Sequence, residues 1–168
     1  MTLELKYTMI FIKQRDQLLL LNRKKPPLMG LWTGVGGKIE HDESPEAGAR
    51  REVFEETGLD LSDFSFRGIV QWKTDSEESG MYLFLSELPN ESHYKTPIQA
   101  IEGILDWKEI SWITDTNNMG IPVHVQRFLS SMLNGELLVH HCIFQQNALV
   151  EYWRESMKVD NSWNSISK

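Results

Sequence analysis

Three glutamates are spaced so that they can bind a divalent cation. Glu52, Glu55 and Glu56 stand at i, i+3 and i+4 of a segment that favours a helix, so their carboxylates share one helix face. Like charges this close repel each other, and a helix gains nothing from them unless a positive group compensates. Mg²⁺ or Mn²⁺ is the natural candidate, because hard cations take carboxylate oxygens as ligands. A solvated acidic face is the alternative that the three glutamates alone leave open.

The residues around these glutamates favour the metal site. Gly37 can present an unhindered backbone carbonyl to a cation. Glu43 lies just before the helix, where it can brace the loop or neutralise a basic side chain, with helix capping as the alternative. Arg51 can reach Glu55 at i+4, or Glu43 across the loop, and so hold a carboxylate in orientation. The segment therefore combines acidic ligands with a cationic side chain that can arrange them.

The segment as a whole resembles the sequence box of the Nudix hydrolases. The family pattern is G-x5-E-x7-R-E-U-x-E-E-x-G-U, where U is a bulky aliphatic residue, and residues 37–59 match it at every defined position. With each fixed residue used at roughly 5–7%, chance gives about one such match in ten billion starting positions. The resemblance implies an α/β fold, namely a Nudix-fold α/β/α sandwich with a mixed β-sheet.

Nudix enzymes hydrolyse a nucleoside diphosphate linked to another group, using Mg²⁺ and the attack of water on phosphorus. The resemblance implies that Glu52, Glu55 and Glu56 bind the metal with help from the Gly37 carbonyl, and that Arg51 belongs to the catalytic group. Mn²⁺ could replace Mg²⁺ in such a site. The general base of the family is often placed at the position of Glu52, but spacing alone does not decide which glutamate takes the proton.

Other candidate site residues lie outside the box. The family usually takes a further acidic ligand from a later loop, and Glu102 is the candidate here, with a plain surface charge as the alternative. Arg23 and Lys38 are the candidate phosphate contacts, because arginine offers a two-point fork and lysine a point charge. Solubility is the alternative reason for both cations.

Residues 31–38 are similar to the matching stretch of the MutT-type Nudix enzymes, which convert 8-oxo-dGTP to the monophosphate and pyrophosphate. The chain has Thr33 where the animal enzyme of this type has an asparagine that reads the oxidised base. A hydroxyl cannot make the two-point contact of an amide, so Thr33 leaves the base preference open. Asp106 and Trp107 are further candidates for base contacts, with core packing as the alternative for the tryptophan.

Length and composition fit one globular domain. The chain has 168 residues, a formal net charge of −7 and the single cysteine Cys142, which excludes a disulfide-stapled secreted fold and favours a cytoplasmic location. No apolar run approaches the roughly 20 residues that span a bilayer, and no signal peptide is visible, so no membrane partner is expected. The acidic balance argues against a nucleic-acid polymer, whereas a small anionic nucleotide is compatible with a metal between the charges. A monomer and a small homo-oligomer both stay open.

The helices and strands that must position these residues are predicted from hydrophobic periodicity and from capping and turn residues. A helix is predicted over residues 45–57, with Ser44 as its N-cap and Gly58 as its stop, and a second helix over 123–133. Strands are predicted over 7–13, 18–21, 64–72, 80–85, 137–144 and 148–153, with 105–113 as strand or turn and 88–99 as a loop. One domain is expected over residues 1–155, followed by a flexible tail over 156–168.

These features predict a Mg²⁺-dependent nucleoside triphosphate pyrophosphohydrolase acting on 8-oxo-dGTP or a related oxidised purine nucleotide. One alternative is a Nudix hydrolase of another nucleoside diphosphate derivative, such as ADP-ribose or a dinucleoside polyphosphate. The other is a Nudix-fold binding module without catalysis. Such modules typically lose at least one box carboxylate, whereas this chain keeps Glu52, Glu55 and Glu56.

Overall fold

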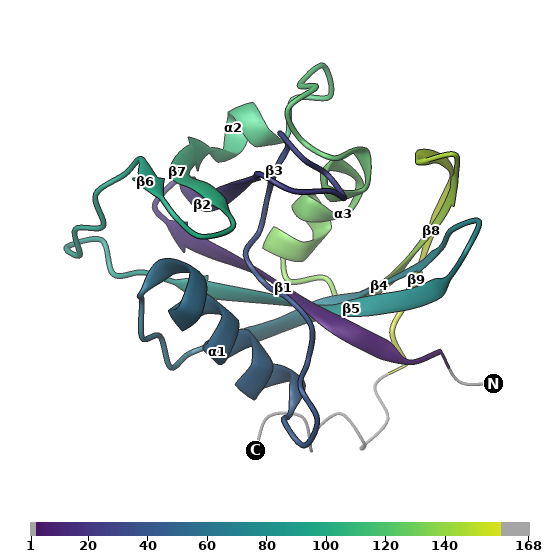
Figure 1. The fold of residues 1–168 in the computed structure, drawn as a ribbon, viewed down its shortest axis with the longest axis horizontal. Helices are drawn as coiled ribbons and strands as arrows, with labels where there is room; N and C mark the ends of the chain where they lie inside the picture. Colours follow the sequence, from purple (N-terminus) through teal and green to yellow (C-terminus); the bar gives the residue numbers. More distant parts are fainter. Residues whose placement is uncertain (1–2, 159–168) are drawn as a thin grey trace.

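One mixed β-sheet runs through the molecule and carries helices on both of its faces (Figure 1). The computed structural model describes residues 3–158. The strands are β1 (Leu5–Gln14), β2 (Gln17–Arg23), β3 (Trp32–Thr33), β4 (Ser65–Lys73), β5 (Glu78–Glu87), β6 (Ile98–Gln99), β7 (Gly103–Glu109), β8 (Leu138–Gln145) and β9 (Ala148–Ser156). The helices are α1 (Pro45–Thr57), α2 (Ile110–Ile113) and α3 (Val123–Leu133). Both predicted helices are confirmed, and each predicted strand overlaps a strand of the structure.

The strand order makes the sheet mixed. The strands follow the order β6-β7-β2-β1-β5-β4-β8-β9, and β3 pairs with β2 beside this path. β1 runs parallel to β5, and β4 runs parallel to β8. The remaining pairs are antiparallel. The predicted α/β fold with a mixed sheet and helices on both faces is therefore confirmed.

Helix α1 begins and ends where its capping residues stand. The Ser44 side chain accepts the N–H of Ala47 at 3.1 Å, which satisfies one of the donors that the first turn leaves unpaired. Gly58 adopts the left-handed conformation at φ 75° and donates its N–H to the Phe54 carbonyl at 2.8 Å. The local signals of the sequence thus set both ends of the helix that carries the three glutamates.

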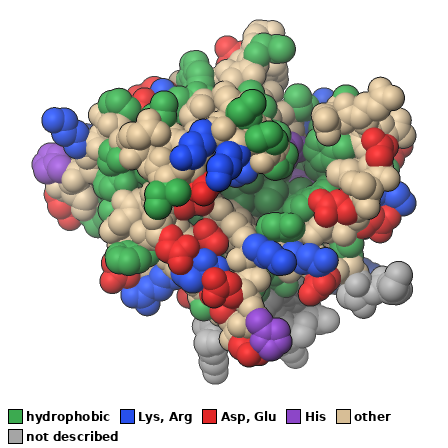
Figure 2. Space-filling model, in the orientation of Figure 1, with side chains coloured by type: hydrophobic (Ala, Val, Ile, Leu, Met, Phe, Trp, Pro, Cys, Tyr) green, Lys and Arg blue, Asp and Glu red, His purple; other side chains and the backbone are tan. Residues whose placement is uncertain are grey.

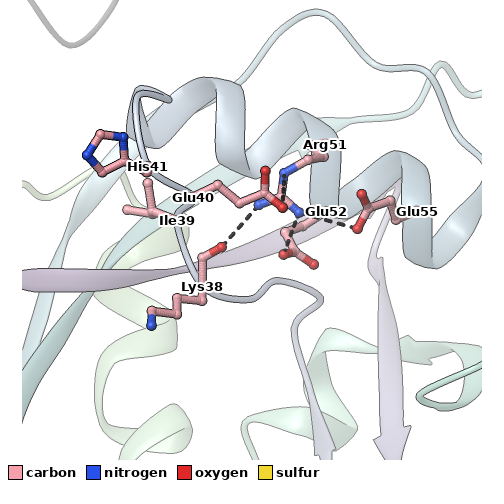
Figure 3. A pocket seen from close by; sticks show the side chains of 7 residues that line it. All are labelled: Lys38, Ile39, Glu40, His41, Arg51, Glu52 and Glu55. Atoms are coloured by element: carbon pink, nitrogen blue, oxygen red, sulfur yellow. Dashed lines mark hydrogen bonds and ion pairs between the residues drawn. The ribbon is translucent and has the colours of Figure 1, made fainter.

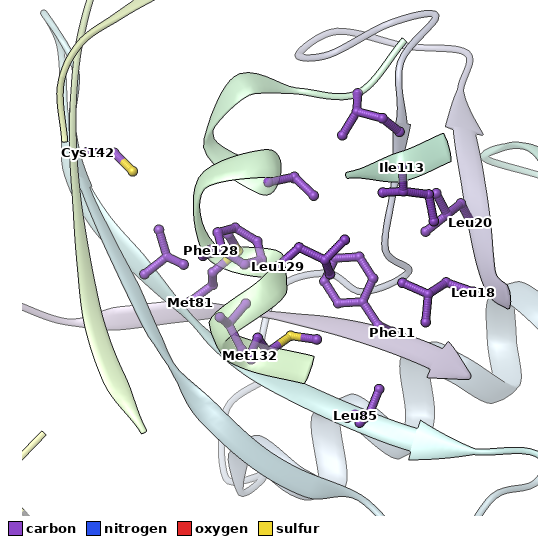
Figure 4. Packing of buried hydrophobic residues seen from close by; sticks show 14 residues of the cluster. Phe11, Leu18, Leu20, Met81, Leu85, Ile113, Phe128, Leu129, Met132 and Cys142 are labelled. Atoms are coloured by element: carbon purple, nitrogen blue, oxygen red, sulfur yellow. The ribbon is translucent and has the colours of Figure 1, made fainter. Parts of the chain in front are cut away.

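Two hydrophobic clusters lie on opposite faces of the sheet. Ala49 and Val53 of α1 are fully buried in the first cluster, together with Ile10, Leu19 and residues from β5 and β7. Phe128 and Leu129 of α3 lie in the second cluster, which Figure 4 shows packed between that helix and the strands. Val53 is buried against the sheet, whereas Glu52 and Glu56 are partly buried and Glu55 is exposed, so the three carboxylates lie at the edge of the contact between α1 and the sheet.

Some segments differ from the sequence prediction. The predicted loop over 88–99 contains the two-residue strand β6, and residues 105–113 divide into the end of β7 and the short helix α2. Ser156, placed in the expected tail, closes β9, and the Met157 N–H donates to the Leu137 carbonyl at 3.1 Å. Residues 159–168 of that tail lie outside the described residues. No helix among the described residues is long and apolar enough to cross a membrane.

Candidate active site

A cavity of about 390 Å³ lies between helix α1 and the neighbouring ends of β2 and β7. It is lined by Arg23, Gly36, Gly37, Glu52, Glu55, Glu56, Ile101 and Glu102. Arg23 ends β2, the glycines precede α1, and Glu102 stands in the turn before β7. Six of these eight residues were predicted as site residues from the sequence, and the structure brings them together; Gly36 and Ile101 were not predicted.

Glu56 is the most enclosed of the three box glutamates. Its Oε2 atom is buried and has no hydrogen-bond partner among the described residues. Burial raises the pKa of Glu56 to about 8, and the charge of Glu52 adds to the rise, while a hydrogen bond from the Gly36 backbone opposes it. A buried carboxylate oxygen without a partner is costly unless a cation or a proton satisfies it. Glu56 thus meets the requirement for a metal ligand.

Glu52 lies against the backbone of Gly37. A side chain at Gly37 would collide with the carboxylate, because a Cβ there would stand 2.5 Å from Glu52 Oε1. Burial raises the pKa of Glu52, although the ion pair with Arg51 opposes the rise. The Gly37 carbonyl itself accepts the Thr8 N–H at 2.9 Å, so one of its lone pairs is engaged with β1. A close approach of backbone and carboxylate explains the need for glycine here.

Arg51 ties the acidic residues to each other (Figure 3). Its Nε and Nη2 atoms donate to the two oxygens of Glu43 at 3.1 and 2.7 Å, which lowers the pKa of the Glu43 carboxyl. Its Nη1 atom donates to Glu52 at 2.9 Å and to Glu55 at 3.3 Å, and Nη2 also reaches the Lys38 carbonyl at 3.0 Å. The sequence predicted Glu43 or Glu55 as the partner of Arg51, and the structure shows both, with Glu52 in addition.

A second cavity of about 530 Å³ adjoins the first one. It is lined by Lys38, Ile39, Glu40, His41, Arg51, Glu52 and Glu55. Glu52 and Glu55 line both cavities and therefore form a common wall. Figure 3 shows the Lys38 side chain extending away from these two carboxylates, so its ammonium group is available to another anion.

The donor set fits a hard divalent cation. Within residues 3–158, no three His, Cys, Asp or Glu side chains are already arranged as a metal site. Arg51 holds Glu52 and Glu55 in their present positions, while Glu56 keeps a buried oxygen free. Carboxylates from Glu52, Glu56 and Glu102 around one cavity are the oxygen ligands that Mg²⁺ and Mn²⁺ prefer.

The candidate base contacts Thr33 and Asp106 lie away from the carboxylates. Thr33 is 3% exposed, and its hydroxyl donates to the Met9 sulfur at 3.6 Å. Asp106 accepts from the Thr96 hydroxyl at 2.6 Å and from the Lys108 ammonium at 2.9 Å. Burial opposes ionisation of Asp106, but the bonds from Lys108 and Thr96 prevail and lower its pKa. Both residues therefore already have partners within the fold.

Trp107 lies on the other face of the sheet from Asp106, because consecutive strand residues point in opposite directions. It packs against the cluster that includes α1, and its indole N–H donates to the Tyr94 carbonyl at 3.0 Å. The structure thus assigns Trp107 to packing and does not bring it to Asp106 as a shared base contact. Lys108, two residues beyond Asp106, shares its face and lies 4.3 Å from the ring centre of Trp32.

Some residues of the site escaped the sequence reasoning. Gly36 was not predicted as a site residue, although it lines the cavity and its backbone bonds to Glu56. Ile101 precedes the candidate ligand Glu102 and carries no chemical signal of its own. Lys108 could have been found, because a strand places residues two apart on one face and Asp106 was already a candidate.

The surface around the site is strongly patterned. Figure 2 shows acidic side chains gathered near the centre of this face, with lysine and arginine side chains on either side of them. Beside the acidic group the surface is hollowed and its floor is hydrophobic (Figure 2). An acidic centre between cations suits a metal and a phosphate chain, and a hydrophobic hollow suits a flat ring.

Comparison with known proteins agrees with this geometry. The family model described as NUDIX domain matches residues 5–114. A mouse oxidized purine nucleoside triphosphate hydrolase is 38% identical over 67 residues, which cover 40% of this chain and only 43% of the mouse protein. The zebrafish (Danio rerio) protein of the same name is 26% identical over 129 residues, covering 73% of this chain and 81% of that protein.

A solved structure supports the fold. A MutT protein from Bacillus halodurans superimposes with a TM-score of 0.74 at 24% sequence identity. The superposition covers 89% of this chain and 96% of that protein. At 24% identity this similarity shows the fold alone. Conclusions about chemistry depend on the residues of the two cavities.

Proposed function

This chain belongs to the Nudix family, and on that premise we propose that it is a Mg²⁺-dependent hydrolase of nucleoside triphosphates. The products would be a nucleoside monophosphate and pyrophosphate. The observation that carries the proposal is the free, buried oxygen of Glu56 in a cavity shared with Glu52, Glu102 and Arg23. Acidic ligands for a metal and a cation for a phosphate meet there.

Each charged residue of the cavity has a role that its environment supports. Glu52, Glu55, Glu56 and Glu102 would hold the metal, and Arg51 would orient the first two through its Nη1 atom. When bound, Mg²⁺ makes water a better nucleophile and neutralises the charge that grows on the phosphate oxygens. The guanidinium of Arg23 would bind a phosphate through its free terminal nitrogens.

The proton from the attacking water needs a carboxylate that can accept it near neutral pH. Burial raises the pKa of both Glu52 and Glu56 in the metal-free protein, which favours either of them over the exposed Glu55. Glu56 has the free oxygen that suits a ligand, and Glu52 is oriented by Arg51. We therefore propose Glu56 as the primary metal ligand, and Glu52 as a metal ligand that also accepts the proton.

We further propose an oxidised purine nucleotide, such as 8-oxo-dGTP, as the substrate. The names of the mouse and zebrafish relatives support this choice, and so do the aromatic side chains on the α3 side of the sheet, Tyr7, Trp32 and Trp72. Flat aromatic groups can stack on a purine ring. The hydrophobic hollow beside the acidic group offers room for such a ring (Figure 2).

A second candidate is a different nucleoside diphosphate derivative. Asp106 is already engaged by Lys108 and Thr96, and the Thr33 hydroxyl faces the Met9 sulfur. Neither group is free to read a base edge without giving up a present partner. This favours a substrate that is selected mainly through its phosphates, such as ADP-ribose or a dinucleoside polyphosphate.

Turnover of a substrate panel tests the proposal. The purified protein with Mg²⁺ is given 8-oxo-dGTP, dGTP, ADP-ribose and a dinucleoside tetraphosphate, and the products are resolved by ion-exchange chromatography. A clearly highest kcat/KM for 8-oxo-dGTP, with monophosphate and pyrophosphate as products, supports the proposed substrate. A higher kcat/KM for another compound keeps the hydrolase and replaces the substrate.

Two variants of α1 link this turnover to the site. Glu56→Gln removes a ligand charge but keeps the shape, so we expect kcat to fall about a thousandfold or more, in line with the loss of a metal-assisted step. Glu46→Gln changes a glutamate of the same helix that lies outside both cavities, and it should keep its activity. Equal activity of Glu56→Gln and the unmodified protein would refute the metal site.

A further inference from the structure

The loop over residues 24–31 is closed by its own hydrogen bonds. The Gly30 N–H donates to the Arg23 carbonyl at 2.7 Å, and the Arg23 N–H donates to the Leu31 carbonyl at 3.1 Å. From the strand side, the Asn22 carboxamide donates to the Gly30 carbonyl at 3.0 Å. The Asn22 side chain thus joins strand β2 to Gly30, near the end of the loop.

The closed loop holds Arg23 in place at the cavity. Arg23 Nε donates to the Pro27 carbonyl at 2.8 Å, which fixes the guanidinium against the loop. The Nη1 and Nη2 atoms lie beyond this tether, on a side chain that lines the cavity with Glu56 and Glu102. The fork available to a phosphate is therefore aimed by the loop, and the loop is closed by Asn22.

The same loop also holds the turn that carries Glu102. The Lys24 N–H donates to the Glu102 carbonyl at 3.1 Å, and the turn is closed by the bond from Ala100 N–H to the Gly103 carbonyl at 2.7 Å. Gly103 permits this approach, because a Cβ at its position would collide with the carbonyl oxygen of Asn22. In the antiparallel pair of β2 and β7, Arg23 stands opposite Gly103, and Asn22 is the next residue along β2.

We propose that Asn22 is a positioning residue that couples phosphate binding at Arg23 to metal binding at Glu102. Its carboxamide holds the loop, and the loop in turn accepts the Arg23 Nε–H at the Pro27 carbonyl and donates the Lys24 N–H to the backbone carbonyl of Glu102. A phosphate bound by Arg23 therefore stabilises the loop that presents Glu102 to the metal. The inference rests on the proposed function and adds a thermodynamic coupling between phosphate binding and metal binding in that site.

Binding measurements without turnover test the coupling. The probes are Mn²⁺ and methylenediphosphonate, a diphosphate analogue, measured by calorimetry separately and together. In the unmodified protein the diphosphonate should tighten Mn²⁺ binding. In Asn22→Leu this tightening should fall about fivefold, the factor expected when one net hydrogen bond is lost. Hydrogen exchange at the Lys24 amide should become faster in the same variant.

A matched control separates coupling from general loosening. Gln14 also donates its carboxamide to a loop, at 2.7 Å to Pro89 and 2.9 Å to Ser92, and that loop does not line the cavity. Gln14→Leu should leave both the coupling and the Lys24 exchange unchanged. Asn22→Asp, which keeps the shape but replaces the donor by an acceptor, should repeat the loss and guards against misfolding of the leucine variant.

The possible failures are distinct. Coupling in Asn22→Leu and Asn22→Asp equal to that of the unmodified protein would overturn the proposal, and so would an equal loss in Gln14→Leu. Mn²⁺ binding that the diphosphonate leaves unchanged in the unmodified protein would overturn the coupling while keeping the metal site. Absence of Mn²⁺ binding would instead refute the proposed function and the inference with it.

Discussion

Burial separates the three box glutamates although they share one helix face. The Glu55 side chain is 56% exposed and the Glu52 side chain 14%, while Glu56 has a buried oxygen without a partner. Their spacing predicted the shared face, because it depends only on the helix. Their ranking could not be predicted, since it depends on how the Gly36 backbone and the Glu102 turn close over the helix end. Residues of one chemical type thus receive different roles from their surroundings.

Glu56→Gln should stabilise the metal-free protein. The pKa of Glu56 is raised from 4.5 in the unfolded chain to about 8 in the fold, mainly by burial, so the fold loses stability as the pH rises from 4.5 to 8. At pH 7.5 with a chelator present, the neutral glutamine should raise the free energy of unfolding by roughly 2 kcal/mol, allowing for partial solvent screening. Urea denaturation measures this difference.

Mg²⁺ should reverse that order. The unmodified protein gains stability from metal binding, whereas the glutamine variant lacks a ligand charge and gains less. Glu55→Gln is the control on the exposed side of the same helix, and its effect in the metal-free protein should stay within about 0.5 kcal/mol. A Glu56→Gln variant that is less stable than the unmodified protein without metal would contradict the burial argument.

Helix α1 shows what local sequence signals can predict at the scale of an element. Its bounds were predicted from Ser44, Pro45 and Gly58, because capping depends on the few residues at each end. Strand β3 was missed, since its two residues pair only through the distant β2. The placement of Trp107 was open for the same reason, because the register of β7 against β2 decides which face each residue takes.

Ser44→Ala should destabilise α1 without changing the chemistry. The lost bond to the Ala47 N–H should lower the free energy of unfolding by about 1 kcal/mol. The melting temperature should then fall by about 2–4 °C, with kcat at 25 °C unchanged. Thermal melting and turnover of the same preparation check both statements. Ser62→Ala, at an exposed position beyond the helix, should leave the melting temperature as it is.

Local sequence signals also could not predict that Arg23 and Glu102 line the same cavity. Both were predicted as site residues from the sequence, but the Lys24–Glu102 bond that joins their segments depends on the pairing of β2 with β7. No periodicity within either segment encodes that contact. The sequence therefore predicted which residues take part, and the tertiary pairing decides how they are connected.

At the scale of the whole molecule, a neutral histidine links the far end of the sheet to α3. His140 is fully buried on β8, and its Nδ1 atom lies 2.8 Å from the Tyr152 hydroxyl of β9, which reaches the Arg127 carbonyl of α3 at 3.3 Å. Burial lowers the pKa of His140 to about 4, and the nearby charges of Arg154 and His141 lower it further. Burial also lowers the pKa of His124, which contacts Phe128, to about 4.

Protonation of His140 in acid should therefore destabilise the fold. The pKa of His140 is about 4 in the fold and 6.5 in the unfolded chain, so the unfolded state binds more protons between these values. The contribution of His140 to stability is full above pH 6.5 and is lost as the pH falls toward 4. Between pH 6.5 and 4.5, His140→Phe should lose about 2 kcal/mol less free energy of unfolding than the unmodified protein, as measured by urea denaturation. An equal loss in that variant would exclude His140 as a source.

The sheet separates the candidate metal ligands from the candidate base contacts. The carboxylates stand on α1, which packs on one face, whereas Trp32, Asp106 and Lys108 lie on the other. Under the proposed function, substitutions on the second face could therefore change which molecule is bound, while the candidate metal ligands on α1 stay as they are. Proteins with this architecture can therefore acquire a new specificity through few substitutions, because a change of the bound molecule does not require a change of the metal-binding residues.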